Sequence, residues 1–266
     1  MSVAPNPLVD LPPPEISLPQ APLVRVIAQV RFPVIASIEQ RAFIAAFQEA
    51  LRPMYPVLRP EMAQGFLVGP QGIAPAPAQT IWRFNDLAGH WRVSLAPDFL
   101  ALETTAYSSR DDFVARLQTA LDALHRHIGP QLADRLGLRY IDRVLLSAEE
   151  DCGGLVRCEI KGLFATPLAR YTRQALSESL FVLPEAGAQF VARWGQLPPR
   201  GTIDPGALEP VDSASWILDL DMFSQEPRPF DTEALVAEAR RYAERIYTMF
   251  RWVVTDEFLR RYGGEL

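Results

Sequence analysis

TIWRFNDLAGHWRVSLAPDFLALET, residues 80–104, predicts three consecutive antiparallel strands and decides the fold class. The strands are expected at 80–85, 90–96 and 98–104, because a hairpin turn at Asp86–Gly89 and a break at Pro97-Asp98 divide the stretch into three segments of strand character. An apolar stripe at helical spacing follows over 110–127. A meander followed by a helix is typical of α+β proteins, in which helices cover one face of an antiparallel sheet.

A second stretch of the chain repeats this plan. Strands are predicted at 173–183, 188–197 and 215–224, with a loop at 198–210, and a long amphipathic helix is predicted at 231–253. Further strands are expected at 23–32, 66–68 and 136–146, a loop at 69–79, and shorter helices at 38–52, near 131–135 and at 255–262. We therefore expect an α+β fold of two similar halves, residues 22–150 and 151–266, each a meander packed against a long helix, as an internal duplication would produce.

Residues 1–21 are expected to form a separate, proline-rich arm. Proline cannot pair in a sheet interior or continue a helix, so this segment predicts an extended chain of the polyproline type. The sequence leaves open whether the arm is disordered or lies over the body of the protein or over a partner.

Composition limits the partners and the compartment. The 266 residues carry a net charge of −6, which argues against nucleic-acid binding because phosphates require a basic face. No apolar run approaches the ~18 residues of a membrane span, and the first residues lack the pattern of a signal peptide, so we expect a cytoplasmic protein. Cys152 and Cys158 are interpreted as ordinary thiols of a reducing compartment, although a local disulfide between them is not excluded.

The common catalytic motifs are missing from the sequence. It contains no Walker A, GxGxxG, GxSxG, HExxH or paired CxxC motif. Of its three histidines, His125 and His127 are two apart on a predicted helix and cannot by themselves form one metal-binding face, and His90 lies at a hairpin edge. Asp219 and Asp221 would share one face of a strand and are the candidates for holding Mg²⁺. The alternative is that these two carboxylates pair with arginines. No cofactor is predicted.

Arginines on predicted strands are the main candidates for a binding site. Two tryptophans adjoin them, and the full candidate set is Arg83, Arg92, Arg139, Arg143, Arg193, Trp82 and Trp91. Strand arginines commonly pair with carboxylates across a sheet, and the partners here would be Glu103, Glu178, Asp219 and Asp221. The functional alternative is a polar sheet face that receives a carboxylate, a phosphate or a peptide backbone. The sequence leaves both interpretations open.

Several short motifs follow one another in a suggestive order. They are VRF (30–32), WRF (82–84), DFLALETTAY (98–107), DDF (111–113), GLRYIDRV (137–144) and LDLDMF (218–223). In these motifs the chain, from about residue 22 to 260, resembles a sporadically distributed bacterial family of similar length without an established enzyme activity. The resemblance implies an accessory role, in defence islands or in gene clusters that make modified peptides, and it supplies no catalytic residues.

These observations favour a non-catalytic binding or accessory protein that holds a peptide or protein partner on a sheet edge or in a groove. Two alternatives remain. One is an enzyme with an unfamiliar carboxylate site that uses Mg²⁺, and the other is a homodimer or structural subunit whose proline-rich arm reaches the neighbouring copy.

Overall fold

The computed structural model describes residues 6–63, 66–69, 72–75, 78–146, 153–183 and 187–265, with the backbone alone for 66–69 and 72–75. The strands are β1 (Leu23–Arg31), β2 (Val57–Ala63), β3 (Phe66–Gly69), β4 (Gly72–Pro75), β5 (Gln79–Asn85), β6 (Trp91–Ala96), β7 (Phe99–Thr104), β8 (Leu132–Ala133), β9 (Arg135–Leu145), β10 (Ala175–Val182), β11 (Ala188–Leu197), β12 (Ser215–Ser224) and β13 (Arg228–Pro229). The helices are α1 (Ala45–Leu51), α2 (Arg110–His127), α3 (Cys158–Lys161), α4 (Thr232–Val253) and α5 (Asp256–Arg261), with short 3₁₀ turns at Ala36–Glu39, Gly162–Ala165 and Ala169–Tyr171.

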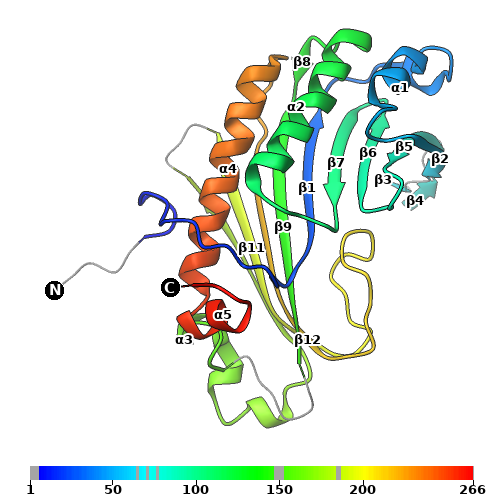
Figure 1. Ribbon diagram of the computed structural model, residues 1–266. Helices are drawn as coiled ribbons and strands as arrows, with labels where there is room; N and C mark the ends of the chain where they lie inside the picture. Colours follow the sequence, from blue (N-terminus) through cyan, green and yellow to red (C-terminus); the bar gives the residue numbers. More distant parts are fainter. Residues whose placement is uncertain are drawn as a thin grey trace. The chain divides into compact units, whose positions relative to one another are not determined.

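The expectation of two similar halves, 22–150 and 151–266, is wrong. The strands of both stretches hydrogen-bond into one nine-stranded sheet in the order β10-β11-β12-β9-β1-β7-β6-β5-β2 (Figure 1). Each expected meander exists, as β5-β6-β7 and as β10-β11-β12, but neither forms a sheet of its own because β9 and β1 lie between them and continue the hydrogen bonding. The composition of helices and antiparallel strands remains that of an α+β protein.

Most individual elements are confirmed, and the exceptions have physical reasons. The helix at 110–127 and the strands at 188–197 and 215–224 have the predicted bounds. The helix expected near 131–135 is wrong, because Ala133 pairs with Arg228 in a strand and β9 begins at once. Strand β2 was not predicted, since its polar residues and Pro60 hide any alternation. The expected loop at 69–79 contains β4.

Two compact units divide the chain. The first comprises the described residues within 1–26, 138–224 and 240–266, and the second those within 27–137 and 225–239. Strands β1 and β9 and helix α4 therefore each contribute residues to both. No helix in the described ranges is long and apolar enough to cross a membrane.

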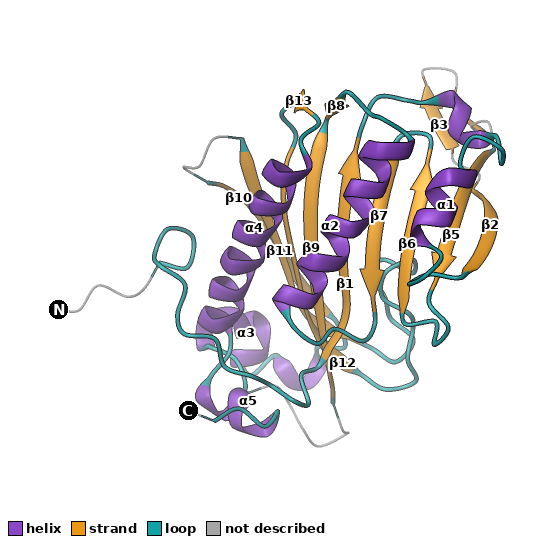
Figure 2. Ribbon diagram, turned by 45° about the horizontal axis from the view of Figure 1, so that its top comes forward, coloured by secondary structure: helices purple, strands orange, loops and turns teal. Residues whose placement is uncertain are grey.

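In the first unit, one face of the strands is apolar and packs against helices. Alternate residues of β11 and β12 are buried on this face, and the apolar stripe of α4, which passes beside these strands, is buried as well (Figure 2). The residues are Phe190, Ala192, Leu218, Leu220, Met222, Tyr242, Ala243, Ile246, Met249 and Val253. The intervening strand positions project from the other face, which carries the charged residues considered below.

In the second unit, the meander β5-β6-β7 packs against α1 and α2. Ser109 caps α2, since its hydroxyl accepts a hydrogen bond from the Asp112 N–H. The buried side chains are Phe47, Leu51, Phe84, Val93, Leu95, Leu100, Leu102, Phe113, Leu117, Leu121 and Leu124. Their spacing is two along the strands and three or four along the helices, as the sequence predicts.

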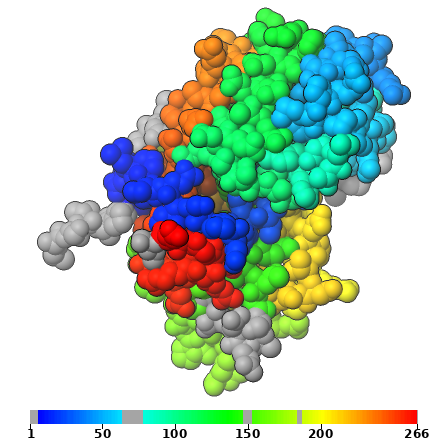
Figure 3. Space-filling view, in the orientation of Figure 1, coloured from blue at the N-terminus to red at the C-terminus, as the bar shows by residue number. Residues whose placement is uncertain are grey.

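The proline-rich arm, described from residue 6, lies along the last helices of its own chain (Figure 3). The Ile16 N–H donates to the Tyr247 hydroxyl at 2.8 Å, and that hydroxyl donates to the Pro14 carbonyl at 3.2 Å. Arg245 donates to the carbonyls of Pro7 and Asp10 at 3.0 and 2.8 Å. The described part of the arm forms no sheet, and side chains of α4 therefore provide hydrogen-bond partners for its backbone groups.

Replacing Tyr247 by Phe should loosen the arm. The change removes two hydrogen bonds to its backbone, so the free energy of unfolding should fall by about 1–2 kcal/mol. Urea denaturation measures the loss, and faster hydrogen exchange of the Ile16 amide locates it. Tyr171→Phe, at an exposed position, is the matched control. Equal stability of the two variants would contradict the role given to the Tyr247 hydroxyl.

Candidate functional site

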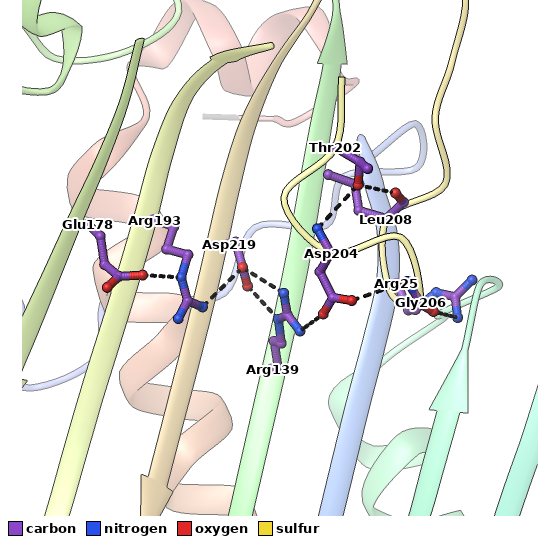
Figure 4. Close-up of polar contacts among 9 residues, drawn as sticks. All are labelled: Arg25, Arg139, Glu178, Arg193, Thr202, Asp204, Gly206, Leu208 and Asp219. Carbon is purple, nitrogen blue, oxygen red and sulfur yellow. Dashed lines mark hydrogen bonds and ion pairs between the residues drawn. The ribbon is translucent and has the colours of Figure 1, made fainter. Parts of the chain in front are cut away.

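A row of alternating charges crosses four neighbouring strands in the first unit (Figure 4). We name it the charge ladder, and it consists of Glu178 on β10, Arg193 on β11, Asp219 on β12 and Arg139 on β9. Glu178 stands opposite Arg193, and Arg193 stands opposite Asp219, in the strand register. The four side chains therefore project from one face, which we name the polar face.

Asp219 is the centre of the charge ladder. Its Oδ1 and Oδ2 accept from Nε and Nη2 of Arg139 at 2.7 and 2.8 Å, and Oδ2 also lies 3.4 Å from Nη1 of Arg193. Arg193 donates in turn to Glu178. The Asp219 side chain is 0 % exposed and that of Glu178 is 61 % exposed, so the row runs from a buried ion pair to the sheet edge.

The segment 198–214, which we name the covering loop, is tied to this row. Asp204 accepts from Nη1 of Arg139 at 2.7 Å, and the Gly206 carbonyl accepts from Arg25 at 3.4 Å. Burial lowers the pKa of Arg139, but the hydrogen bonds and charges of Asp219 and Asp204 outweigh burial and raise the pKa above the ordinary arginine value. The guanidinium of Arg139 thus joins a buried strand carboxylate to a loop carboxylate.

Inside the covering loop, local hydrogen bonds fix the position of Asp204. Thr202 donates to the Leu208 carbonyl at 2.6 Å and accepts from the Asp204 N–H at 3.2 Å (Figure 4). Leu208 is buried, which gives the loop an apolar anchor. The loop is therefore held by both packing and charge.

Arg143 lies on the same face of β9 as Arg139 but, among the described residues, lacks a paired carboxylate at the same guanidinium atoms. It is only 8 % exposed, and its buried Nε and Nη2 have no hydrogen-bond partner within the described ranges. Burial lowers its pKa, and the charge of Glu209 opposes that change. The corresponding Nε and Nη2 atoms of Arg139 both donate to the Asp219 carboxylate.

The apolar residues of β10 flank Glu178 on the polar face. Because alternate strand residues share a face, Leu176, Leu180 and Val182 project on the same side as Glu178. Leu180 is 59 % and Val182 80 % exposed. The outermost strand thus presents an apolar surface interrupted by one carboxylate.

The remaining predicted site residues belong to the second unit. Arg83 donates to Glu61 and Ser94 at 2.9 and 2.7 Å, and Arg92 donates to Glu103. Trp82 is buried and donates to the Ile38 carbonyl at 2.8 Å. Trp91 is also buried, under the guanidinium of Arg116 at 4.3 Å from its ring centroid. All four have partners within their own unit.

The structure brings together three of the predicted residues, Arg139, Arg193 and Asp219. The expected pairing of strand arginines with carboxylates is confirmed for Glu103, Glu178 and Asp219. Asp204 was missed because it lies in a segment that the sequence identifies only as a loop. Its signal was weak: a Thr-x-Asp sequence followed by Pro-Gly, which favours a tight turn around the carboxylate.

The two aspartates proposed for Mg²⁺ are placed differently by the structure. Both oxygens of Asp219 are engaged by guanidinium groups, while Asp221 lies half-buried two positions farther along the same face. Within the described ranges, no three His, Cys, Asp or Glu side chains are arranged to hold a metal ion. Cys158 is exposed, and Cys152 lies outside the described residues, so the question of their pairing does too.

Comparison with known proteins supplies no further assignment. No family model matches the chain, and no curated protein matches it.

Replacing Asp219 by Asn should strongly destabilise the protein. The variant leaves Arg139 and Arg193 partly buried without their shared counter-charge, and breaking such a pair costs about 3–5 kcal/mol. Urea denaturation measures this loss. Asp212→Asn breaks an exposed ion pair with Arg200 and should cost no more than about 1 kcal/mol. Similar losses in the two variants would show that the charge ladder is not an important stabilising element.

Asp142 predicts a pH-dependent stability. This buried carboxyl group lies on the opposite face of β9 from Arg139, and burial raises its pKa from 3.8 to about 7. Between these values the folded state binds more protons than the unfolded state. The contribution of Asp142 to the free energy of unfolding is therefore fully present below pH 3.8 and is lost as the pH rises to about 7.

Asp142→Asn should remove this dependence. Between pH 5 and pH 8 the wild-type protein should lose about 3 kcal/mol more of its free energy of unfolding than the variant does. Urea denaturation at the two pH values measures the difference. Asp122→Asn, at an exposed position of α2, should keep the wild-type profile. A parallel profile for Asp142→Asn would rule out the assignment.

Proposed function

We propose that the protein is a non-catalytic binding protein that takes an extended segment of a partner polypeptide as an added strand beside β10. The observation that carries this proposal is the state of that strand. β10 is the outermost strand of the sheet, its one strand neighbour in the described ranges is β11, and none of its side chains is fully buried. An edge strand of this kind is a template for pairing with another chain.

The backbone of β10 is oriented for such pairing. The Leu183 N–H donates to the Ala188 carbonyl at 3.1 Å, in line with the antiparallel register between β10 and β11. In an antiparallel pair, successive residues alternately direct both backbone groups toward and away from the partner. Alternation from Leu183 therefore directs outward the N–H and C=O groups of Leu176, Glu178, Leu180 and Val182.

The other edge strand, β2, carries residues that hinder pairing with an additional strand. Its exposed middle residues are Arg59, Pro60, Glu61 and Met62, and proline cannot donate a hydrogen bond to an added strand. β10 contains no proline, and its one charged residue, Glu178, is paired with Arg193. The contrast supports a docking role for β10, since the features that prevent unwanted pairing are concentrated on β2.

The charge ladder connects β10 to the strands beside it. Glu178 is linked through Arg193 to the buried Asp219 and through it to Arg139, so polar contacts connect β10 to three strands behind it. Connected polar networks restrict the positions of the strands that they join. An added strand would consequently meet a surface that is largely fixed before binding, which lowers the entropic cost of association.

The proposal is tested with peptides selected from a displayed random library on the immobilised protein. Leu180→Pro should weaken their binding by about tenfold or more, because it removes an outward N–H and an exposed apolar side chain while the N–H groups that pair with β11 remain. Leu180→Ala separates the loss of the side chain from the loss of the backbone donor. Urea denaturation checks that both variants are folded.

Hydrogen exchange locates the bound peptide. The outward amides of residues 176, 178, 180 and 182 should become protected when a selected peptide binds. Unchanged binding to Leu180→Pro, or no protection on β10, would overturn the proposal. Analytical ultracentrifugation tests whether a second copy of this chain pairs with β10 instead. A dimer that the Leu180→Pro variant dissociates would show such pairing and would also overturn the proposal.

A further inference from the structure

We infer that the strand added at β10 carries a lysine or arginine opposite Glu178, with an apolar residue two positions away on each side. This inference rests on the proposed function and specifies the chemistry of the partner. It follows from the pattern that the polar face repeats from strand to strand.

Charge alternates in sign along the charge ladder. Glu178, Arg193 and Asp219 occupy matched positions in the register of β10, β11 and β12, and Arg139 on β9 continues the row. Opposite charges across neighbouring strands are stabilising, whereas like charges are destabilising. The position opposite Glu178 on an added strand therefore favours a cation. Glu178 is the more exposed of the two carboxylates in the ladder, so its side chain can reach that cation.

On β10 and β11, the positions beside the ladder on the polar face carry no charge. Leu180 stands opposite Val191, and Leu176 stands opposite Gly195. A strand added outside β10 would place its residues two positions before and after the cation next to these leucines. The partner sequence is then apolar, any, basic, any, apolar. Because this pattern is symmetric, it fits a strand that runs in either direction.

The positions between these three residues face the other side of the sheet. There β10 offers Ser177 and Ser179, of which the first is exposed and the second half-buried. Small polar side chains such as serine and threonine suit these positions, since serine and threonine form cross-strand hydrogen bonds. The selective positions are consequently the cation and the two apolar residues.

Two segments of this chain that could compete for the edge lack the required cation. Neither β10 nor residues 1–22 contain lysine or arginine. A second copy pairing through its own β10 would therefore leave Glu178 without a counter-charge on that side. Charge complementarity accordingly favours a different polypeptide over both the proline-rich arm and a second β10.

The test compares three synthetic peptides derived from one library-selected peptide, with lysine, glutamine or glutamate at the position opposite Glu178. The lysine peptide should bind up to about fivefold more tightly than the glutamine peptide, the upper value expected for an exposed ion pair. The glutamate peptide should bind most weakly. Raising the salt concentration should compress this ranking, because exposed charges are screened.

Protein variants assign the ranking to Glu178. Glu178→Gln should bind the three peptides with nearly equal affinity, and Glu178→Lys should prefer the glutamate peptide. Asp212→Asn, which neutralises an exposed carboxylate of the same unit, should keep the wild-type ranking. Urea denaturation verifies that each variant is folded.

The outcomes separate this inference from the proposed function. Equal affinities of the three peptides for the wild-type protein, with the β10 amides still protected, would overturn the inference and leave strand addition standing. Unchanged ranking in Glu178→Gln would also overturn it. If the peptides bind without protecting β10, both the inference and the proposed function are wrong.

Discussion

The buried ion pair between Arg139 and Asp219 is the interaction on which the polar face depends. It removes the Asp219 carboxylate from water, and the two-point contact with Arg139 compensates for that cost together with Arg193. The pair also fixes strand register. A shift of β12 by one residue would turn Asp219 into the apolar face and expose Leu218 or Leu220, so the ladder admits one alignment of β12 with its neighbours.

Local patterns were sufficient to predict most strands and the two long helices. β11 and β12 are rich in apolar and aromatic residues interrupted by single polar ones, and α2 combines a serine cap with a continuous apolar stripe, so local sequence was sufficient to identify each element. Pairing between distant strands is a different problem. Nothing local in β1 or β9 specifies that they adjoin each other in the sheet, and the two meanders were therefore interpreted as separate halves.

The candidate site was predictable to a similar extent. The alternation of arginines with apolar residues correctly indicated that Arg193 and Arg139 meet carboxylates. It did not distinguish the linked ladder from the local pairs of Arg83 and Arg92, because that distinction depends on which strands are neighbours. The contribution of Asp204 and the burial of Arg143 depend on the path of the covering loop, which sequence periodicity does not describe.

The docking of the proline-rich arm has a consequence for the order of events during synthesis. Ile16 leaves the ribosome 231 residues before Tyr247, its hydrogen-bond partner. Throughout that interval the α4 side chains that hydrogen-bond the arm have not yet been made, and the prolines of the arm disfavour its pairing with the strands that form meanwhile. The first unit, which contains both the arm and the end of α4, can thus be completed only after translation of α4. Docking of the arm therefore waits for most of the chain, whereas the pairing partners of the meander β5-β6-β7 emerge within one short stretch of chain.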